Sequence, residues 1–356
     1  MAAVHDFAQE RSIDCDALRC DTVDVFYDIV EWEKAKESVA LMKKLMNDEF
    51  ISKYTFWDAT QTAQIFLAPG ALGSLTYEAG SLSAYRFTIG ILKLALAKGL
   101  NLQCNTPVTS IKKSKGEGDR TKWSVCTERG TIQAEKVVLA TNGYTAHLYP
   151  ALQGVIVPFR GIVTAQRPGR SMPQKGLDMT FSFIYKYGYE YMISRPEGSK
   201  FEGDIVIGGG LTKGKSGGVE EFGNTADNVV DDDIVKYLEQ STKEFFGTNW
   251  GTDHAEGRVR KTWSGVMGYS ADGHPLVGPM PSEDGLYIDA SFQGHGMVLC
   301  FLCAKAVSQM IMGKDGPELE QWFPASFRVS EARLEKKFGW NMKISKATEL
   351  EQETKP

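Results

Sequence analysis

The sequence predicts an α/β domain joined to an α+β domain in which antiparallel strands dominate. The four residues 137–140 are all apolar, which is typical of a parallel strand buried on both faces. The region between residues 150 and 208 is instead rich in segments with the pattern of strands, which favours a mostly antiparallel arrangement. The length of 356 residues leaves room for about two domains. These observations favour two differently built domains.

The first part of the chain alternates between strands and helices. Residues 22–28 alternate with the period of a strand, and residues 29–47 place apolar side chains on one broad helical face. Ser83 is a suitable N-cap for a helix over 85–98, which Gly99 would end. The next segments predict short strands and a hairpin at 100–104, 108–111, 122–127 and 131–134.

The second part adds more strands, an amphipathic helix and a buried helix. Strands are predicted at 162–165, 189–193, 205–207, 259–263 and 286–290, and helices at 231–246 and 297–312. The helix at 297–312 is apolar nearly all round, so we expect it to be buried. The segment 329–356 is charged and lacks a core pattern, which predicts a surface or disordered tail.

The composition argues against nucleic acid or an anionic membrane as a partner. The chain has 40 basic and 45 acidic residues, a net charge of −5. Its longest apolar stretch, 297–304, is far shorter than the ~18 residues of a membrane span. With six cysteines and no secretory signal, we expect reduced thiols and a cytoplasmic protein.

One segment matches a phosphate-binding motif letter by letter. Residues 209–216 fit G-x-x-x-x-G-K-[ST] and come after a predicted strand. A P-loop has to run directly into a helix, whose amides complete the anion site. Here Gly217, Gly218 and Gly223 come next, so no helix is expected. We interpret the segment as a flexible loop between strands.

Metal and hydrolase signatures are weak. Cys300 and Cys303 share one face of an apolar helix, and no second correctly spaced pair supports a zinc site, so core thiols are the better interpretation. The sequence holds neither G-x-S-x-G nor H-E-x-x-H. Ser270, Asp272 and His274 are more typical of a turn than of a nucleophile with its base.

Two glycine-containing turns are more informative. A predicted strand ends at Ala290, and Gly294 and Gly296 then open directly into the apolar helix. Such glycines let the backbone approach a ligand, and the helix amides favour negative charge. A tight connection without a ligand has the same pattern, so both interpretations stay open here. The turn at 140–143 allows the same two interpretations, a ligand-binding turn or a tight connection.

These segments together resemble the D-amino-acid-oxidase-like superfamily of FAD-dependent oxidoreductases, in its glycine, sarcosine and glutamylputrescine oxidase branch. The matching stretches, in order, are 80–85, 105–111, 137–144, 157–161, 191–196, 204–209, 263–275 and 291–297. The resemblance implies that an FAD-binding Rossmann-like domain is interleaved with a mostly antiparallel β substrate domain. It places the cofactor domain at about 83–150 and 265–328, and the substrate domain at about 15–82 and 151–264.

The resemblance also implies site residues. Val108, Thr141, Asn142 and Gly143 would lie by the adenosine half of FAD. A second group would lie at the flavin pyrimidine, where helix amides stabilise negative charge: Gly294, His295, Gly296 and Met297. Arg160 is the candidate for a substrate carboxylate or the flavin edge, and Tyr191, Arg195 and Trp263 are candidate pocket walls.

The sequence departs from the family at two points. It contains no G-x-G-x-x-G, the motif that seats the FAD pyrophosphate, and it starts at a point resembling the family's chain about a hundred residues in. We therefore expect an incomplete cofactor domain and weak or absent FAD binding. Gly265 lies near the position where flavinylated relatives carry the attaching cysteine, so any flavin would be non-covalent.

The chemistry implied is the oxidation of a primary or secondary amine or an amino acid. Hydride leaves the carbon next to nitrogen for the flavin, water hydrolyses the imine, and dioxygen becomes hydrogen peroxide. The catalytic residues cannot be assigned from the sequence. An alternative from another class is a cofactor-free relative that acts as a binding or interaction protein.

Overall fold

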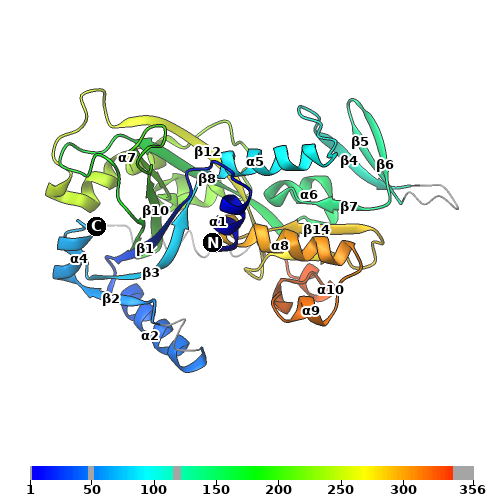
Figure 1. The fold of residues 1–356 in the computed structure, drawn as a ribbon, viewed down its shortest axis with the longest axis horizontal. Coiled ribbons are helices and arrows are strands. Elements are labelled where there is room, and N and C mark those ends of the chain that lie inside the picture. The colour runs from blue at the N-terminus through cyan, green and yellow to red at the C-terminus, as the bar shows by residue number, and fades with distance from the viewer. Residues whose placement is uncertain (1, 47–51, 115–121, 340–356) are drawn as a thin grey trace. The chain divides into compact units, whose positions relative to one another are not determined.

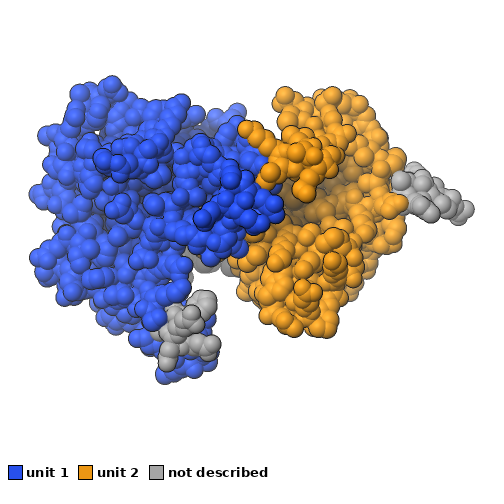
Figure 2. Space-filling view, viewed as in Figure 1, with its two compact units in different colours: residues 1–91, 161–218, 227–265 blue, residues 92–160, 219–226, 266–356 orange. Residues whose placement is uncertain are grey.

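The computed structural model describes residues 2–46, 52–114 and 122–339. The chain forms two compact units, shown in different colours in Figure 2. Unit 1 comprises residues 1–91, 161–218 and 227–265, and unit 2 comprises residues 92–160, 219–226 and 266–356. The mixed α/β fold expected from the sequence is confirmed.

Unit 1 is built around a large mixed sheet (Figure 1) with the strand order β12-β8-β11-β10-β9-β1-β3-β2. Its strands are β1 (Leu18–Phe26), β2 (Thr55–Asp58), β3 (Gly73–Ser81), β8 (Ile156–Gln166), β9 (Thr180–Tyr185), β10 (Gly188–Ser194), β11 (Ile205–Gly208) and β12 (Val259–Ser270). β9, β10, β11 and β8 are joined by antiparallel pairing, whereas β1 pairs with β9 in parallel. The first residues of β8 and the last of β12 belong to unit 2.

Helix α7 (Asp232–Phe246) covers one face of this sheet. The Oδ1 atom of Asp231 caps the helix by accepting from Asp233 N at 2.9 Å and Ile234 N at 3.1 Å. Its Phe245 ring stacks on Phe183 of β9 with a centroid separation of 4.0 Å. Among the described residues, the other helical segments of unit 1 are α1 (Ala2–Glu10), α2 (Ile29–Leu45), α4 (Ala59–Ile65), most of α5 (Ala84–Ala97), η3 (Leu211–Lys213), the first part of η4 (Lys215–Glu221) and η5 (Gly247–Asn249).

The described part of unit 2 contains two three-stranded sheets. One has the order β13-β14-β7, from β13 (Leu276–Pro279), β14 (Leu286–Ala290) and β7 (Val137–Leu139). The other is the meander of β4 (Val108–Lys113), β5 (Trp123–Thr127) and β6 (Gly130–Ala134). The helical segments are α6 (Thr145–Leu148), α8 (Gly296–Ile311), α9 (Pro317–Glu320), α10 (Glu331–Leu334), η1 (Asn142–Tyr144), η2 (Pro150–Leu152) and η6 (Ala325–Phe327). β7 and β14 are parallel, as the apolar run at 137–140 suggested.

Three expectations from the sequence need correction. Within the described residues β7 pairs on one side only, so it lies at an edge, and Val138 is exposed. Helix α8 is buried along one stripe rather than all round, because Met297 and Leu302 face solvent. No strand forms at 100–104.

The charged segment after residue 328 is in part packed against unit 2. Val329 and Leu334 contact the apolar cluster around β13 and β14. The amide of Phe338 donates to Gly154 O at 2.9 Å, and its ring meets Phe222 edge-on. Residues 329–339 therefore belong to the folded unit, and residues 340–356 of the predicted tail lie outside the described residues.

Candidate functional site

The turn between β14 and α8 has an unusual backbone conformation. Ser291, Gln293 and Gly294 have φ angles of 69°, 55° and 77°, in the left-handed region. Two of these residues carry a Cβ, for which this region is strained. The side-chain amide of Gln293 holds the turn, because its Nε2 donates to Ser291 O at 3.1 Å and Ser291 Oγ at 3.0 Å. Strain of this kind is often found at ligand-binding turns.

Asn142 connects this turn to the end of β7. Its Oδ1 accepts a hydrogen bond from Ser291 N at 2.9 Å. A Cβ on Gly143 would lie 2.6 Å from Met267 O, and a Cβ on Gly268 would lie 2.6 Å from Asn142 Oδ1. The segments after β7 and β14 thus meet the end of β12 in one junction within unit 2, and only glycine fits at 143 and 268.

Helix α8 begins at this junction without a side-chain cap. His295 is the N-cap residue, and its ring Nδ1 lies 2.7 Å from Gln293 O rather than on the helix amides. Gly294, His295 and Met297 are exposed. An exposed N-terminus of a 16-residue helix carries a partial positive charge, which suits an anionic oxygen of a ligand.

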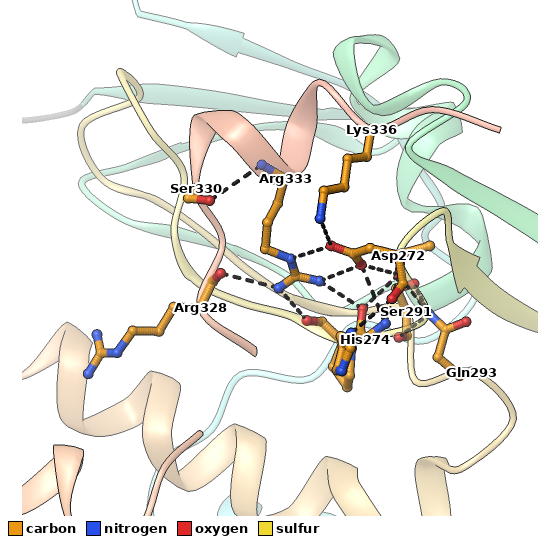
Figure 3. A network of polar contacts seen from close by, with 10 residues as sticks. Asp272, His274, Ser291, Gln293, Arg328, Ser330, Arg333 and Lys336 are labelled. Atoms are coloured by element: carbon orange, nitrogen blue, oxygen red, sulfur yellow. Dashed lines mark hydrogen bonds and ion pairs between the residues drawn. The ribbon is translucent and has the colours of Figure 1, made fainter. Parts of the chain in front are cut away.

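A polar network supports the Gln293 turn (Figure 3). Gln293 Nε2 donates to Ser270 Oγ at 2.9 Å, and Ser270 Oγ donates to His274 O at 2.7 Å and lies 3.1 Å from Asp272 Oδ1. Arg333 of α10 forms a fork on Asp272, with Nε–Oδ2 at 2.8 Å and Nη2–Oδ1 at 2.9 Å. The Arg333 guanidinium holds the pKa of the Asp272 carboxyl well below its usual range.

Sequence reasoning missed the role of Arg333 and Gln293. Ser270 and Asp272 do form a turn, as expected. That turn also accepts a hydrogen bond from the side-chain amide of Gln293. One local signal was available: Ser330 is the N-cap of α10, and its Oγ accepts from Arg333 N at 3.4 Å. A serine before Glu331 is a typical helix start.

The expected cofactor residues of unit 2 are only partly gathered at this junction. Asn142, Gly143, Gly294 and the start of α8 meet there, and Thr141 Oγ1 lies 3.0 Å from Thr145 Oγ1 of α6. Val108 begins β4, on the separate meander sheet. That strand contacts α6, which comes directly after η1.

Tyr191 lies on the exposed face of the unit 1 sheet. It pairs with Gly208 of β11, and a Cβ on Gly208 would lie 2.4 Å from the Tyr191 hydroxyl oxygen. The ring therefore lies across the β11 backbone, where only glycine leaves room. Tyr189 is 52% exposed with its ring centroid 6.4 Å from that of Tyr191, and Trp263 of β12 is 39% exposed. In the sheet order, β11 and β8 lie between the strand of the two tyrosines and the strand of Trp263.

The two expected site arginines lie in different units, and each is paired with a carboxylate. Arg160 is buried in unit 2, where its Nε and Nη2 bind Glu221 at 2.5 and 2.8 Å. Arg195 comes after β10 in unit 1 and binds Asp16 Oδ2 at 2.6 Å. Asp16 also binds Arg86, and the two arginines lower its pKa. The structure does not bring the two arginines together within one unit.

The comparisons with known proteins agree with the sequence resemblance. The family model described as FAD dependent oxidoreductase (DAO) matches residues 1–310. The chain belongs to this family. A probable oxidoreductase OrdL of Rhizobium meliloti is 24% identical over 241 residues, 66% of this chain and 48% of that protein. A glycine oxidase of Pseudomonas aeruginosa is 24% identical over 226 residues, 63% of this chain and 54% of that protein. The chain thus matches about half the length of these relatives.

Solved structures share the fold at lower sequence identity. Glycine oxidase from Geobacillus kaustophilus superposes with a TM-score of 0.70 at 17% identity, over 93% of this chain and 80% of that one. L-proline dehydrogenase from P. horikoshii gives 0.67 at 18% identity, over 92% and 81%. At this identity the superpositions support the fold alone.

The junction in unit 2 fits one edge of an FAD molecule. The helix N-terminus offers backbone donors to anionic oxygens, and a Cβ on Gly296 would meet only Phe292 Cβ, at 3.9 Å, so a ligand could approach closely. In the described ranges, no group of three His, Cys, Asp or Glu side chains could hold a metal ion. None of the helices in those ranges is long and apolar enough to cross a membrane.

Proposed function

We propose that this chain takes part in FAD-dependent oxidation of an amine, with dioxygen as the final acceptor and hydrogen peroxide as a product. The observation that carries the proposal is the strained β14–α8 turn. Hydrogen bonds made by the side chains of Asn142 and Gln293 stabilise this turn, and a helix without a side-chain cap follows it. A turn maintained against strain at a helix N-terminus is better explained by a ligand than by chain connection alone.

The residues of unit 2 would bind and orient the cofactor. Backbone amides from Gly294 to Met297 would donate to the electron-rich pyrimidine edge of the flavin, while Asn142 and Gly143 would contact its adenosine half together with Thr141 and Val108. FAD, when bound, supplies the two-electron acceptor for hydride from the carbon next to nitrogen. Tyr191 and Trp263 would line the substrate side, so unit 1 would be the substrate domain and unit 2 the cofactor domain.

We also propose that these residues alone hold FAD weakly and without a covalent bond. The sequence has no G-x-G-x-x-G, so it offers no amides of that motif for the pyrophosphate. Titration of the purified chain with FAD, followed by flavin fluorescence, should give a Kd no tighter than about 1 μM. Stoichiometric flavin in the purified chain would contradict weak binding.

Peroxide formation tests the activity itself. The chain in excess FAD is mixed with a panel of amines and amino acids, and bleaching of flavin absorbance and peroxide are measured together. Reduction by at least one compound supports the proposed oxidase. Saturable FAD binding with no reduction by any compound would favour the second candidate, a relative that binds without catalysis. The internal pairing of Arg160 by Glu221 is the observation that favours this second candidate.

A further inference from the structure

We propose that Lys213 and Glu190 form a proton-controlled contact: when Glu190 loses its proton, the Lys213 ammonium moves from two tyrosine rings onto the carboxylate and fixes the turn after β11. The inference goes beyond the proposed function, because it concerns unit 1 alone and needs no FAD. It starts from four side chains that lie together around this turn. We call Tyr185, Glu190, Lys213 and Tyr237 the Glu190 cluster.

The two carboxyl oxygens of Glu190 have different surroundings. The residue lies on β10 and is 0% exposed. Its Oε1 accepts hydrogen bonds from the Tyr185 hydroxyl at 2.6 Å and from Gly210 N at 3.0 Å, whereas its Oε2 is buried without a hydrogen-bond partner among the described residues. Because two donors occupy Oε1, a proton on Glu190 is carried by Oε2. Loss of this proton would leave a buried, charged oxygen without a donor, which is unfavourable.

The cation of the Glu190 cluster is Lys213. Its Nζ lies 5.2 Å from the centroid of the Tyr237 ring and 5.6 Å from that of the Tyr185 ring, and the residue is exposed. Lysine carries a compact ammonium on a flexible four-carbon stem, so the group can move between two partners without a change in the backbone. Cation–π attraction at an exposed site is weak enough for a nearby carboxylate to compete with the rings.

The backbone of the turn connects Glu190 to Lys213. Gly209 and Gly210 have φ angles of 128° and 65°, and η3, which carries Lys213, follows them directly. Gly210 N donates to Glu190, and a Cβ on Gly210 would lie 2.8 Å from Tyr237 Cδ1. The turn is therefore packed against the Glu190 cluster, and a Lys213–Glu190 contact would hold it at a second point, three residues further along the chain.

Glu190 is the member of the cluster that titrates near neutral pH. Burial raises the pKa of Glu190 to about 7, although the two tyrosine hydroxyls, the Gly210 amide and Lys213 act in the opposite direction. Burial, followed by the charge of Glu190, raises the pKa of Tyr185 and Tyr237 above the usual range, so both hydroxyls stay protonated. Among the described residues, the titratable groups that face Glu190 are these two tyrosines, from β9 and α7, and Lys213 from η3. The proton on Glu190 therefore decides whether Lys213 has a charged partner.

Acetylation of Lys213 tests the inference, with Lys215 as the internal reference. Lys215 is exposed in the same loop, so the general rise of amine reactivity with pH divides out of the Lys213 to Lys215 ratio. The full chain is treated briefly with acetic anhydride at pH 6, 7 and 8, and mass spectrometry measures the modification of each lysine. An ion pair with a carboxylate protects the amine, so the ratio should fall by about threefold from pH 6 to pH 8. A constant ratio in wild type would overturn the inference.

Glu190→Gln separates the contact from other effects of pH. The amide keeps the size of the side chain but cannot ionise, so the acetylation ratio of this variant should be the same at pH 6 and pH 8. A fall as large as that of wild type would show that a group other than Glu190 controls Lys213, and the inference would be wrong.

Lys213→Gln tests the contact from the other side, at an exposed position where the fold tolerates the change. Without the ammonium, ionised Glu190 loses its partner, so the titration of Glu190 should move to higher pH. The pH dependence of Tm that Glu190→Gln abolishes reports this titration, and circular dichroism measures it from pH 5 to pH 9. Lys215→Gln is the matched control and should keep the wild-type curve. Equal curves for Lys213→Gln and Lys215→Gln would show that Lys213 does not bind ionised Glu190.

Discussion

Two strand-to-turn segments of this chain lead into different structures. The segment after β11 matches the P-loop motif at every position, yet Ser216, Gly217 and Gly218 all have left-handed φ angles and α7 does not begin until Asp232. The segment after β14 has only two glycines, yet α8 begins at the second of them, Gly296, and runs for 16 residues. A helix N-terminus, and not the spacing of the motif, is what creates an anion site.

The surroundings of the two turns differ as well. Gly210 N in the first turn donates to Glu190 Oε1 at 3.0 Å, and Tyr185 donates to the same carboxyl oxygen at 2.6 Å. An internal carboxyl group thus occupies this turn and would repel a phosphate when ionised. The β14 turn is lined instead by the hydroxyls of Ser270 and Ser291 and the amide of Gln293. Of the two turns, the second is therefore the one whose direct side-chain contacts are uncharged.

Removing the support of the β14 turn should have the largest effect. Arg333→Ala removes the fork from the mostly buried Asp272, which keeps Lys336 Nζ at 3.7 Å, so we expect a loss of about 3 kcal/mol in unfolding free energy at pH 7 and weaker FAD binding. Arg328→Ala is the control, because its pair with Asp315 is about one-third exposed and worth at most ~1 kcal/mol. Its side chain points away from the network (Figure 3). Equal losses in the two variants would contradict the supporting role.

The effect of Arg333→Ala on stability should also depend on pH. Arg333 lowers the Asp272 pKa in the folded state, so the stabilisation is complete above the unfolded pKa of ~3.9 and is lost as pH falls through the lower folded value. The difference in Tm between wild type and Arg333→Ala should therefore be constant from pH 7 to 5 and shrink below pH 4. Thermal unfolding monitored by circular dichroism measures it. A gap that widens in acid would disprove the assigned pairing.

Crowding the junction should have the next largest effect. In Gly143→Ala the new Cβ would lie 2.6 Å from Met267 O, so the chain has to shift, at a cost of about 1–3 kcal/mol. Because the shift occurs beside Asn142, FAD affinity should fall as well. Gly316→Ala is the control, since no atom lies within 4 Å of its Cβ. Wild-type FAD affinity in Gly143→Ala would show that the junction does not hold the cofactor.

The buried acid beneath the first turn should give a smaller, pH-dependent effect. Burial raises the pKa of Glu190 to about 7, so the folded state binds the proton more tightly and stability falls as pH rises between ~4.3 and 7. Glu190→Gln removes this titration. The Tm of the variant, relative to that of wild type, should therefore rise by a few degrees between pH 5 and pH 8. Glu244 is exposed, so Glu244→Gln is the control, and its Tm should differ from that of wild type by a constant amount from pH 5 to pH 8. Parallel curves for Glu190→Gln and wild type would show that Glu190 titrates normally.

The sequence predicted the features that local patterns encode and missed those that distant partners decide. Alternation and apolar runs predicted the mixed fold, since side-chain period depends directly on backbone conformation. The strand–glycine–helix pattern pointed to Gly294 and Gly296. By contrast, Arg333 meets Asp272 and Arg160 meets Glu221 across 61 residues each, and no local pattern encodes such a pair. The edge position of β7 and the packing of Val329 depend on tertiary neighbours in the same way.

The smallest expected effect sharpens the comparison of the two turns. Lys215 is the motif lysine, and in a P-loop it would contact the β- and γ-phosphates. Here it lies exposed at the start of η4, where no α-helix begins and Glu190 occupies the neighbouring turn. Lys215→Ala should therefore leave FAD affinity and Tm unchanged, and ATP should bind neither wild type nor variant in an equilibrium titration. ATP binding by wild type that Lys215→Ala abolishes would show that the motif alone suffices, against the requirement for a helix N-terminus.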